Sequence, residues 1–158
     1  MVIPHFFSKS SLPTHLPYKL SVDINRLSKT SSQRSLAKKA FLYVVGNWGG
    51  PRYNMLFKFH RLFYRDISRI FKTKGYLHCT SMNYILRVLL VKSGLFSDSD
   101  ISIRFTNTWF VCPHQYLEVK LDDGDVLYLD PWNYQFGISY GNVGSGFDST
   151  RIRSSFKK

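Results

Sequence analysis

The chain has 158 residues, of which 44% are hydrophobic and 16% aromatic, and this composition indicates one globular domain rather than a disordered protein. Lys and Arg outnumber Asp and Glu by 22 to 10, which gives a formal net charge of +12. Arg87 interrupts the longest apolar run, 85–91, so we expect no transmembrane helix. Two cysteines are too few for a disulfide framework, and the first residues lack the pattern of a secretory signal. We therefore expect a cytoplasmic protein.

The first fifty residues divide into an irregular part and a helix. Residues 8–17 are rich in Ser, Pro and Thr, and a polar loop follows, so 1–32 is expected to be a partly flexible arm and loop. Over 33–45 the apolar residues recur on one helical face and predict a helix: Leu36, Ala40, Phe41 and Val44. The segment 47–51, with two glycines and a proline, ends this helix. The folded domain is predicted to span 33–158.

All of the net positive charge lies in residues 1–74, which contain fourteen Lys or Arg and two Asp. Within this part the sequence predicts a helix over 54–72 with two stripes at helical spacing. The apolar stripe consists of Leu56, Phe59, Phe63, Ile67 and Ile70, and the basic stripe consists of Lys58, Arg61, Arg65, Arg69 and Lys72. A basic face can bind an acidic protein, anionic lipid or, less favoured here, nucleic acid, but a simply solvated face is the commoner case.

A further helix is predicted from Cys79 to Leu90. Its apolar residues follow one helical face: Met82, Ile85, Leu86, Leu89 and Leu90. Cys79 lies in the first turn, where unpaired backbone N–H groups and the positive end of the helix dipole favour a thiolate. The same N–H groups can donate hydrogen bonds to a developing oxyanion. Cys79 is therefore a candidate nucleophile.

Two strands are predicted next, over 114–121 and 126–130. The residues between them, Asp-Asp-Gly-Asp, form a turn in which Gly124 can adopt the positive φ that a tight hairpin requires. The later stretch 137–146 contains four glycines and is interpreted as either a mobile loop over the site or a tail.

The length of the hairpin loop decides whether His114 can reach Asp130. A three-residue loop puts Tyr116 opposite Asp130 and makes His114 and Asp130 diagonal neighbours on one face. A two-residue loop puts Leu117 opposite Asp130 and turns the carboxylate to the other face. A hydrogen bond between His114 and Asp130 therefore requires the three-residue loop.

Cys79, His114 and Asp130 supply the chemistry of a nucleophile, a general base and an orienting carboxylate. A thiolate is strongly nucleophilic, an imidazole can hold it ionised, and a carboxylate on the other ring nitrogen fixes the imidazole tautomer. Each residue taken singly has an ordinary interpretation, as a small core Cys, a satisfied His or an Asp-Pro turn. Their joint occurrence with a suitable helix and hairpin favours a catalytic triad.

Three motifs resemble the transglutaminase-like branch of the papain-like cysteine enzymes: Leu77-His78-Cys79, His114-Gln115-Tyr116-Leu117-Glu118-Val119 and Tyr128-Leu129-Asp130-Pro131-Trp132. The resemblance covers 75–133. It implies an α+β fold in which N-terminal helices precede a Cys-bearing helix packed on a small antiparallel sheet. It also implies Cys79 as the nucleophile, His114 as the base and Asp130 as the orienting residue.

Three further residues are candidates for the cleft. In the resembled family a Trp or polar side chain upstream of the Cys often helps to line the oxyanion hole, so Trp48 is the candidate by position, although a core Trp is commoner. His78 and Trp132 flank the reactive residues. An alternative takes four residues as zinc ligands: His78, Cys79, Cys112 and His114. Adjacent helical side chains diverge by about 100° and the usual two-residue gaps between ligands are missing, so we expect no metal.

The sequence thus predicts hydrolysis or acyl transfer at an amide bond of a protein or peptide, through a thioester and without a cofactor. Acyl transfer from a thioester donor, as in the Cys-His-Asp acetyltransferases, uses the same triad and stays open. A different class of function also stays open: a catalytically inactive module whose basic helix binds an acidic partner or nucleic acid.

Overall fold

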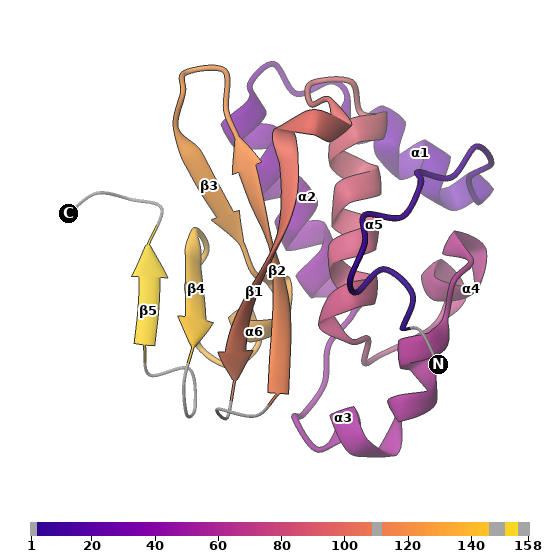
Figure 1. Ribbon diagram of the computed structural model, residues 1–158. Helices are drawn as coiled ribbons and strands as arrows, with labels where there is room; N and C mark the ends of the chain where they lie inside the picture. The colour runs from indigo at the N-terminus through magenta and orange to yellow at the C-terminus, as the bar shows by residue number, and fades with distance from the viewer. Residues whose placement is uncertain (1–2, 109–111, 146–150, 155–158) are drawn as a thin grey trace.

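The computed structural model describes residues 3–108, 112–145 and 151–154, and it has the α+β architecture expected from the sequence (Figure 1). The helices are α1 (Tyr18–Leu27), α2 (Gln33–Asn47), α3 (Asn54–Phe57), α4 (Ile67–Lys72), α5 (Cys79–Lys92) and α6 (Pro131–Tyr134), with 3-10 helices η1 (Phe59–Phe63) and η2 (Asp98–Asp100). The strands are β1 (Ile101–Thr108), β2 (Cys112–Lys120), β3 (Val126–Leu129), β4 (Asn142–Ser145) and β5 (Arg151–Ser154). None of the helices in this described part has the length and apolar character needed to cross a membrane.

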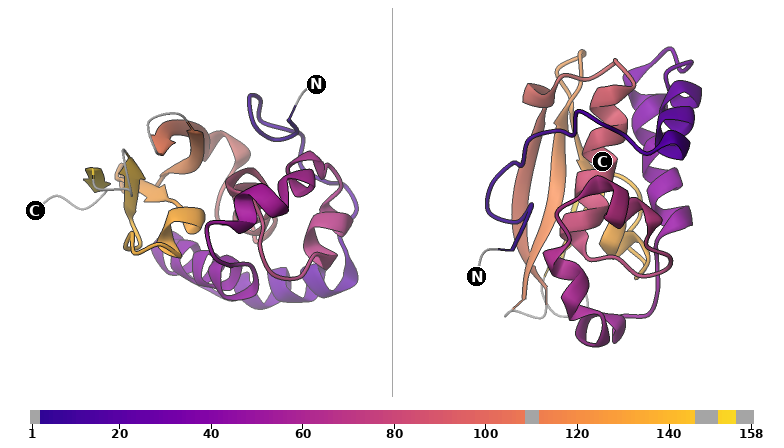
Figure 2. Two further views of the ribbon diagram at one scale, coloured as in Figure 1. Left: turned by 90° about the horizontal axis from the view of Figure 1, so that it is seen from below. Right: turned by 90° about the vertical axis from the view of Figure 1, so that its right-hand side faces the viewer.

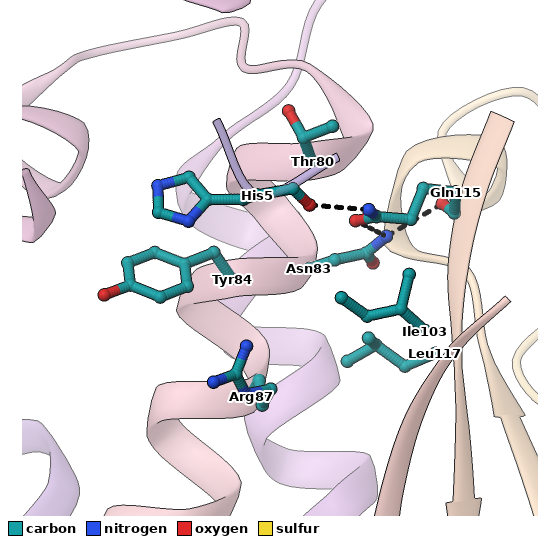
Figure 3. Close-up of a pocket in the computed structure, with 8 residues that line it drawn as sticks. All are labelled: His5, Thr80, Asn83, Tyr84, Arg87, Ile103, Gln115 and Leu117. Carbon is teal, nitrogen blue, oxygen red and sulfur yellow. Dashed lines mark hydrogen bonds between the residues drawn. The ribbon is translucent and has the colours of Figure 1, made fainter. Parts of the chain in front are cut away.

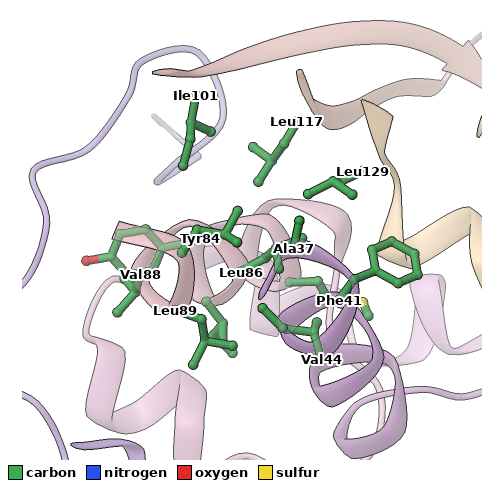
Figure 4. Close-up of a cluster of buried hydrophobic side chains, with 14 of the residues drawn as sticks. Ala37, Phe41, Val44, Tyr84, Leu86, Val88, Leu89, Ile101, Leu117 and Leu129 are labelled. Atoms are coloured by element: carbon green, nitrogen blue, oxygen red, sulfur yellow. The ribbon is translucent and has the colours of Figure 1, made fainter. Parts of the chain in front are cut away.

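Helix α5 lies at the centre of the molecule, between α2 and the antiparallel sheet β1-β2-β3 (Figures 1 and 4). Apolar side chains from these three layers form one core that includes Phe41, Val44, Leu86, Leu89, Leu117 and Leu129. The helix predicted from Cys79 is confirmed as α5, but its burial extends beyond one face, since Asn83 and Arg87 are only 1% and 2% exposed. A helix enclosed by layers on several sides has no solvated face. Arg87 is compatible with burial because its Nε donates to Asp98 at 2.8 Å.

The predicted hairpin register is confirmed. β2 and β3 pair with Leu117 opposite Leu129, which corresponds to a loop of three residues, 122–124. Gly124 has a φ of +84° and donates its N–H to the carbonyl of Leu121 at 3.0 Å. A residue with a Cβ pays a steric cost at this φ, so glycine here helps to select the three-residue loop.

Several elements are additional to those predicted, and two of them, α1 and β1, belong to the core and to the main sheet. Helix α1 lies within 1–32, and its Leu20, Ile24 and Leu27 are buried in the core, so this part of the chain is not an arm throughout. The spacing of four and then three residues is a helical signal that the sequence analysis did not use. Strand β1 pairs with β2 along its whole length and alternates apolar and polar residues.

The helix predicted over 54–72 is wrong as one element, because the chain forms α3, η1 and α4 in its place. Tyr64 and Asp66 have extended backbone angles, with ψ of 124° and 131°. The Asp66 side chain accepts the backbone N–H of Arg69 at 2.9 Å and so caps the start of α4. An Asp at this position favours a new helix start over a continuous helix. Its carboxylate accepts a backbone N–H that in a continuous helix would donate to a carbonyl of the preceding turn.

The second sheet, β4 with β5, lies on the far side of the main sheet from the helices (Figure 1). Val143 of β4 packs with Tyr116 and Tyr128 in a small separate cluster. The glycine-rich stretch 137–146 therefore contains a paired strand and is neither a tail nor a loop over the site, although Gly146 itself lies outside the described residues.

Candidate active site

Three element ends meet at one end of the main sheet: α5 begins, β2 begins and β3 ends there (Figure 1). Helix α5 starts at Cys79, His114 is the third residue of β2, and Asp130 directly follows β3. Antiparallel pairing of β2 with β3 brings His114 and Asp130 together, and packing of α5 on the sheet brings Cys79 to them.

Asp130 holds the ring of His114. Nε2 of His114 lies 2.8 Å from Oδ1 of Asp130, and the two side chains are 2% and 0% exposed. Asp130 also caps α6: its Oδ1 accepts the backbone N–H of Asn133 at 3.1 Å and its Oδ2 accepts the Asn133 side-chain amide at 2.9 Å. A carboxylate with these donors is an acceptor, so His114 donates Nε2–H to it and keeps Nδ1 for another partner.

The Cys79 side chain lies beside His114 in the wall of the same cavity, and its contact with the ring favours the protonated imidazole. Burial, the largest influence, lowers the pKa of His114, but the charge of Asp130, their hydrogen bond and the contact with Cys79 together raise it from 6.5 to about 10. The imidazole is therefore protonated at neutral pH, and an imidazolium is the counter-charge that a thiolate requires.

The backbone around Cys79 leaves hydrogen-bond donors free. Cys79 is the first residue of α5, and no side chain among the described residues caps this helix. The first intrahelical bond at this end runs from the N–H of Met82 to the carbonyl of His78 at 3.0 Å. The N–H group of Cys79 is thus one of the unpaired donors of a helix start, next to the sulfur.

Trp132 lies against the ring of His114, with 5.2 Å between the ring centroids. Its indole Nε1–H donates to the hydroxyl of Tyr76 at 3.0 Å, so the orientation of Trp132 is fixed from the segment that precedes α5. Burial, the largest influence, raises the pKa of Tyr76 above its ordinary value, so its hydroxyl stays protonated. Trp132 therefore covers the His114 ring, and Tyr76 holds Trp132 in place.

A cavity of about 300 Å³ opens beside Cys79 and His114. His78 and Trp132 lie in its wall, together with Ile3, Phe6, Phe7, Met55, Phe59, Leu62, Thr80 and Pro113. The Nε2 of His78 lies 3.0 Å from the carbonyl oxygen of Lys58, so the chain between α3 and η1 is attached to the start of α5. Burial lowers the pKa of His78, so its ring is neutral and donates Nε2–H to that carbonyl.

Two groups of predicted residues are not at this site. Trp48 is a core residue: its Nε1–H donates to the carbonyl of Thr73 at 2.8 Å and its ring packs on Phe71, so its N–H cannot serve an oxyanion hole. The basic stripe from Lys58 to Lys72 does not exist as one face, because the helix that would carry it is broken. One member of it, Arg61, donates to the Lys74 and Tyr76 carbonyls at 3.1 and 2.6 Å.

In the described part of the chain, no group of three or more His, Cys, Asp or Glu side chains is arranged to hold a metal ion, as the zinc alternative would require. The side chain of Cys112 lies outside that part.

Two residues of the site escaped the sequence analysis. Asn133 orients Asp130, and Gln115, next to His114, is buried and hydrogen-bonded to the N-terminal segment. The sequence Asp130-Pro131 is a recognisable helix start, an N-cap followed by proline at N1, and could have pointed to Asn133. No local signal identifies the partners of Gln115, because the His5 and Phe6 carbonyls lie more than one hundred residues away in the chain and Asn83 lies 32 residues away.

No protein-family model matches the chain, and no curated protein or solved structure matches it significantly.

Proposed function

We propose that Cys79, His114 and Asp130 form a catalytic triad for cysteine-dependent acyl chemistry, as the resemblance to the transglutaminase-like enzymes implies. The observation that carries this proposal is the position of the His114 ring. One nitrogen is held by Asp130 at 2.8 Å, and Cys79 lies beside the ring in the wall of the same cavity and favours its protonated form. A buried carboxylate orients the ring and stabilises the imidazolium, which leaves the sulfur as the group that reacts.

The proposed reaction starts with attack of the Cys79 sulfur on the carbonyl carbon of an amide or thioester. The developing oxyanion accepts the N–H of Cys79 at the start of α5. His114 then gives its Nδ1 proton to the leaving nitrogen or sulfur, and the C–N or C–S bond breaks to leave a thioester on Cys79. A water molecule or an acceptor amine attacks that thioester, His114 takes its proton, and the free sulfur returns.

Hydrolysis is the simpler outcome, because water needs no second binding site. The proposed substrate is a protein, a peptide or a small acyl compound, and the chemistry uses no cofactor. A reducing compartment such as the cytoplasm keeps the thiol in the form that this mechanism needs. The competing interpretation, an inactive module that binds acidic partners through one basic helix, has less support because that helix is divided into three short elements.

The first test is the rate at which iodoacetamide labels Cys79 as a function of pH, read by peptide mass so that Cys112 is followed separately. In the parent protein we expect labelling of Cys79 to persist well below pH 8.5, the region where an ordinary free thiol loses reactivity. In His114→Ala the rate at pH 6.5 should fall about tenfold or more, since the counter-charge is gone. His15→Ala is the matched control, because His15 is exposed and is not among the residues of the site.

A Cys79 that is inert, or that responds to pH in the same way with and without His114, would remove the basis for this function.

A further inference from the structure

The cavity beside Cys79 has a wall of apolar side chains from two separate parts of the chain. Ile3, Phe6 and Phe7 come from the N-terminal segment, whereas Met55 comes from α3 and Phe59 and Leu62 come from η1. The volume, about 300 Å³, is roughly twice that of the apolar cavity of about 150 Å³ that holds one benzene ring. The space therefore fits an aromatic ring with a short chain.

Three polar side chains in this wall already have partners within the protein, whereas the Thr80 hydroxyl is buried and has no partner among the described residues. His78 uses its Nε2–H on the Lys58 carbonyl, Trp132 uses its Nε1–H on Tyr76, and His114 lies between Asp130 and Cys79. No Lys, Arg, Asp or Glu is among the described residues that line the cavity. The His114 imidazolium in this wall already faces the Asp130 carboxylate. A charged group placed here would therefore lose its hydration without gaining a free counter-ion, whereas an apolar group would gain from burial.

The N-terminal part of the wall is fixed in place rather than loosely laid over the site. The Nε2 amide of Gln115, a residue 1% exposed, donates to the carbonyls of His5 and Phe6 at 2.7 and 3.0 Å (Figure 3). Asn83 of α5 in turn donates its Nδ2 amide to the backbone carbonyl and the Oε1 of Gln115 at 2.8 and 3.2 Å. The wall is thus attached to α5 and β2, the two elements that carry Cys79 and His114.

The ring of His5 strengthens this attachment. It stacks on Tyr84 of α5 with 4.0 Å between the ring centroids (Figure 3). Its Nε2 and Nδ1 lie 3.2 Å from the Arg65 carbonyl and 2.7 Å from the Ser10 hydroxyl. The chain then crosses α5 on its way to α1, as the right-hand view of Figure 2 shows. A wall held by contacts of this kind is preorganised for one shape of ligand.

We infer that the substrate carries a compact, uncharged apolar acyl group, of the size of a phenylacetyl or branched-chain acyl group, and that this cavity encloses it. The inference rests on the proposed function. The acyl group is the part of the substrate that stays bonded to Cys79 throughout the thioester stage, so it occupies the space directly beside the sulfur. The leaving group departs before that stage ends and does not need an enclosed site.

The test compares three thioesters that share one small leaving thiol, N-acetylcysteamine, and differ only in the acyl group: acetyl, phenylacetyl and succinyl. Acylation of Cys79 in the full-length protein is followed by intact mass and peptide mass. We expect phenylacetyl transfer to exceed acetyl transfer by about tenfold or more, and succinyl transfer to be the slowest.

Two neighbouring phenylalanines provide a matched pair of variants. Phe59 and Phe57 are both exposed, at 53% and 78%, so alanine at either position leaves the core intact, but only Phe59 lines the cavity. The ratio of phenylacetyl to acetyl rates should fall about fivefold in Phe59→Ala and stay within about twofold of the parent value in Phe57→Ala.

The possible results separate this inference from the proposed function. Acetyl transfer that depends on His114 but shows no phenylacetyl preference, or that is slower than succinyl transfer, overturns the inference and leaves the triad in place. Equal ratios in Phe59→Ala and Phe57→Ala also overturn it. No acylation of Cys79 by any of the three thioesters overturns both.

Discussion

Asp130→Asn should remove a pH dependence of stability that His114 contributes. Burial acts to lower the pKa of His114, but the charge and hydrogen bond of Asp130 lead the influences that raise it to about 10. Below pH 6.5 this residue is protonated in both the folded and the unfolded chain, so its contribution to stability is fully present. As the pH rises from 6.5 to 10 the unfolded chain loses the proton first, and the contribution is lost.

The size of the effect follows from the shift. A rise from 6.5 to about 10, at about 1.4 kcal/mol per pKa unit, sets an upper limit of about 5 kcal/mol. At pH 8.5, about two units above the unfolded value, about 2–3 kcal/mol should already be lost. Asp130→Asn removes the two largest influences that raise the pKa of His114 and leaves burial, the largest influence of all, so this loss is expected to disappear. The titratable groups that face the imidazole are the buried Asp130 and the partly exposed Cys79.

The assay is urea unfolding under reducing conditions, followed by Trp fluorescence, at pH 6.5, 7.5 and 8.5. The parent protein should lose stability across this range, while Asp130→Asn and the control His114→Gln should be flat. Cys79→Ser removes any contribution of the thiol to the slope. His5 and His78 do not interfere, because burial lowers the pKa of both and their contributions are lost only as the pH falls below 6.5. A flat profile for the parent protein, or the parent slope in Asp130→Asn, would refute a protonated His114.

Two further substitutions test the contacts that build the site. Gln115→Leu leaves the His5 and Phe6 carbonyls without their buried donor and removes one of the two acceptors of the Asn83 amide. The free energy of unfolding should fall by about 2–3 kcal/mol and proteolysis near the N-terminus should accelerate; unchanged proteolysis would argue against the attachment. Asp98→Asn removes the counter-charge of Arg87, whose side chain is 2% exposed, but Asp98 is 41% exposed, so a loss of about 1–3 kcal/mol is expected in urea unfolding. Stability equal to the parent would contradict this role of the ion pair.

Local rules were sufficient for several parts of this fold. The helical spacing of apolar residues predicted α2 and α5, and both helices begin at the predicted residue. The composition of the turn around Gly124, together with the need to join His114 to Asp130, predicted the register of the hairpin. These features depend on residues within one helical turn or one tight loop, where the sequence states the geometry directly.

Other features depended on which distant segments meet. The stripes over 54–72 looked continuous in sequence, yet Asp66 caps a new helix there and the exposed side chain of Phe59 joins the cavity instead of a helical face. Trp48 had a suitable position for an oxyanion hole, but the carbonyl of Thr73 takes its N–H.

The sequence alone therefore determined the reactive residue types, their order and the local elements that carry them. The tertiary structure decided which polar groups are already paired and which apolar side chains surround Cys79, as the contact of Gln115 with residues 5 and 6 illustrates. The physical reason is that burial and hydrogen-bond pairing depend on segments far apart in the chain, and the periodicity of any one segment carries no information about its partner.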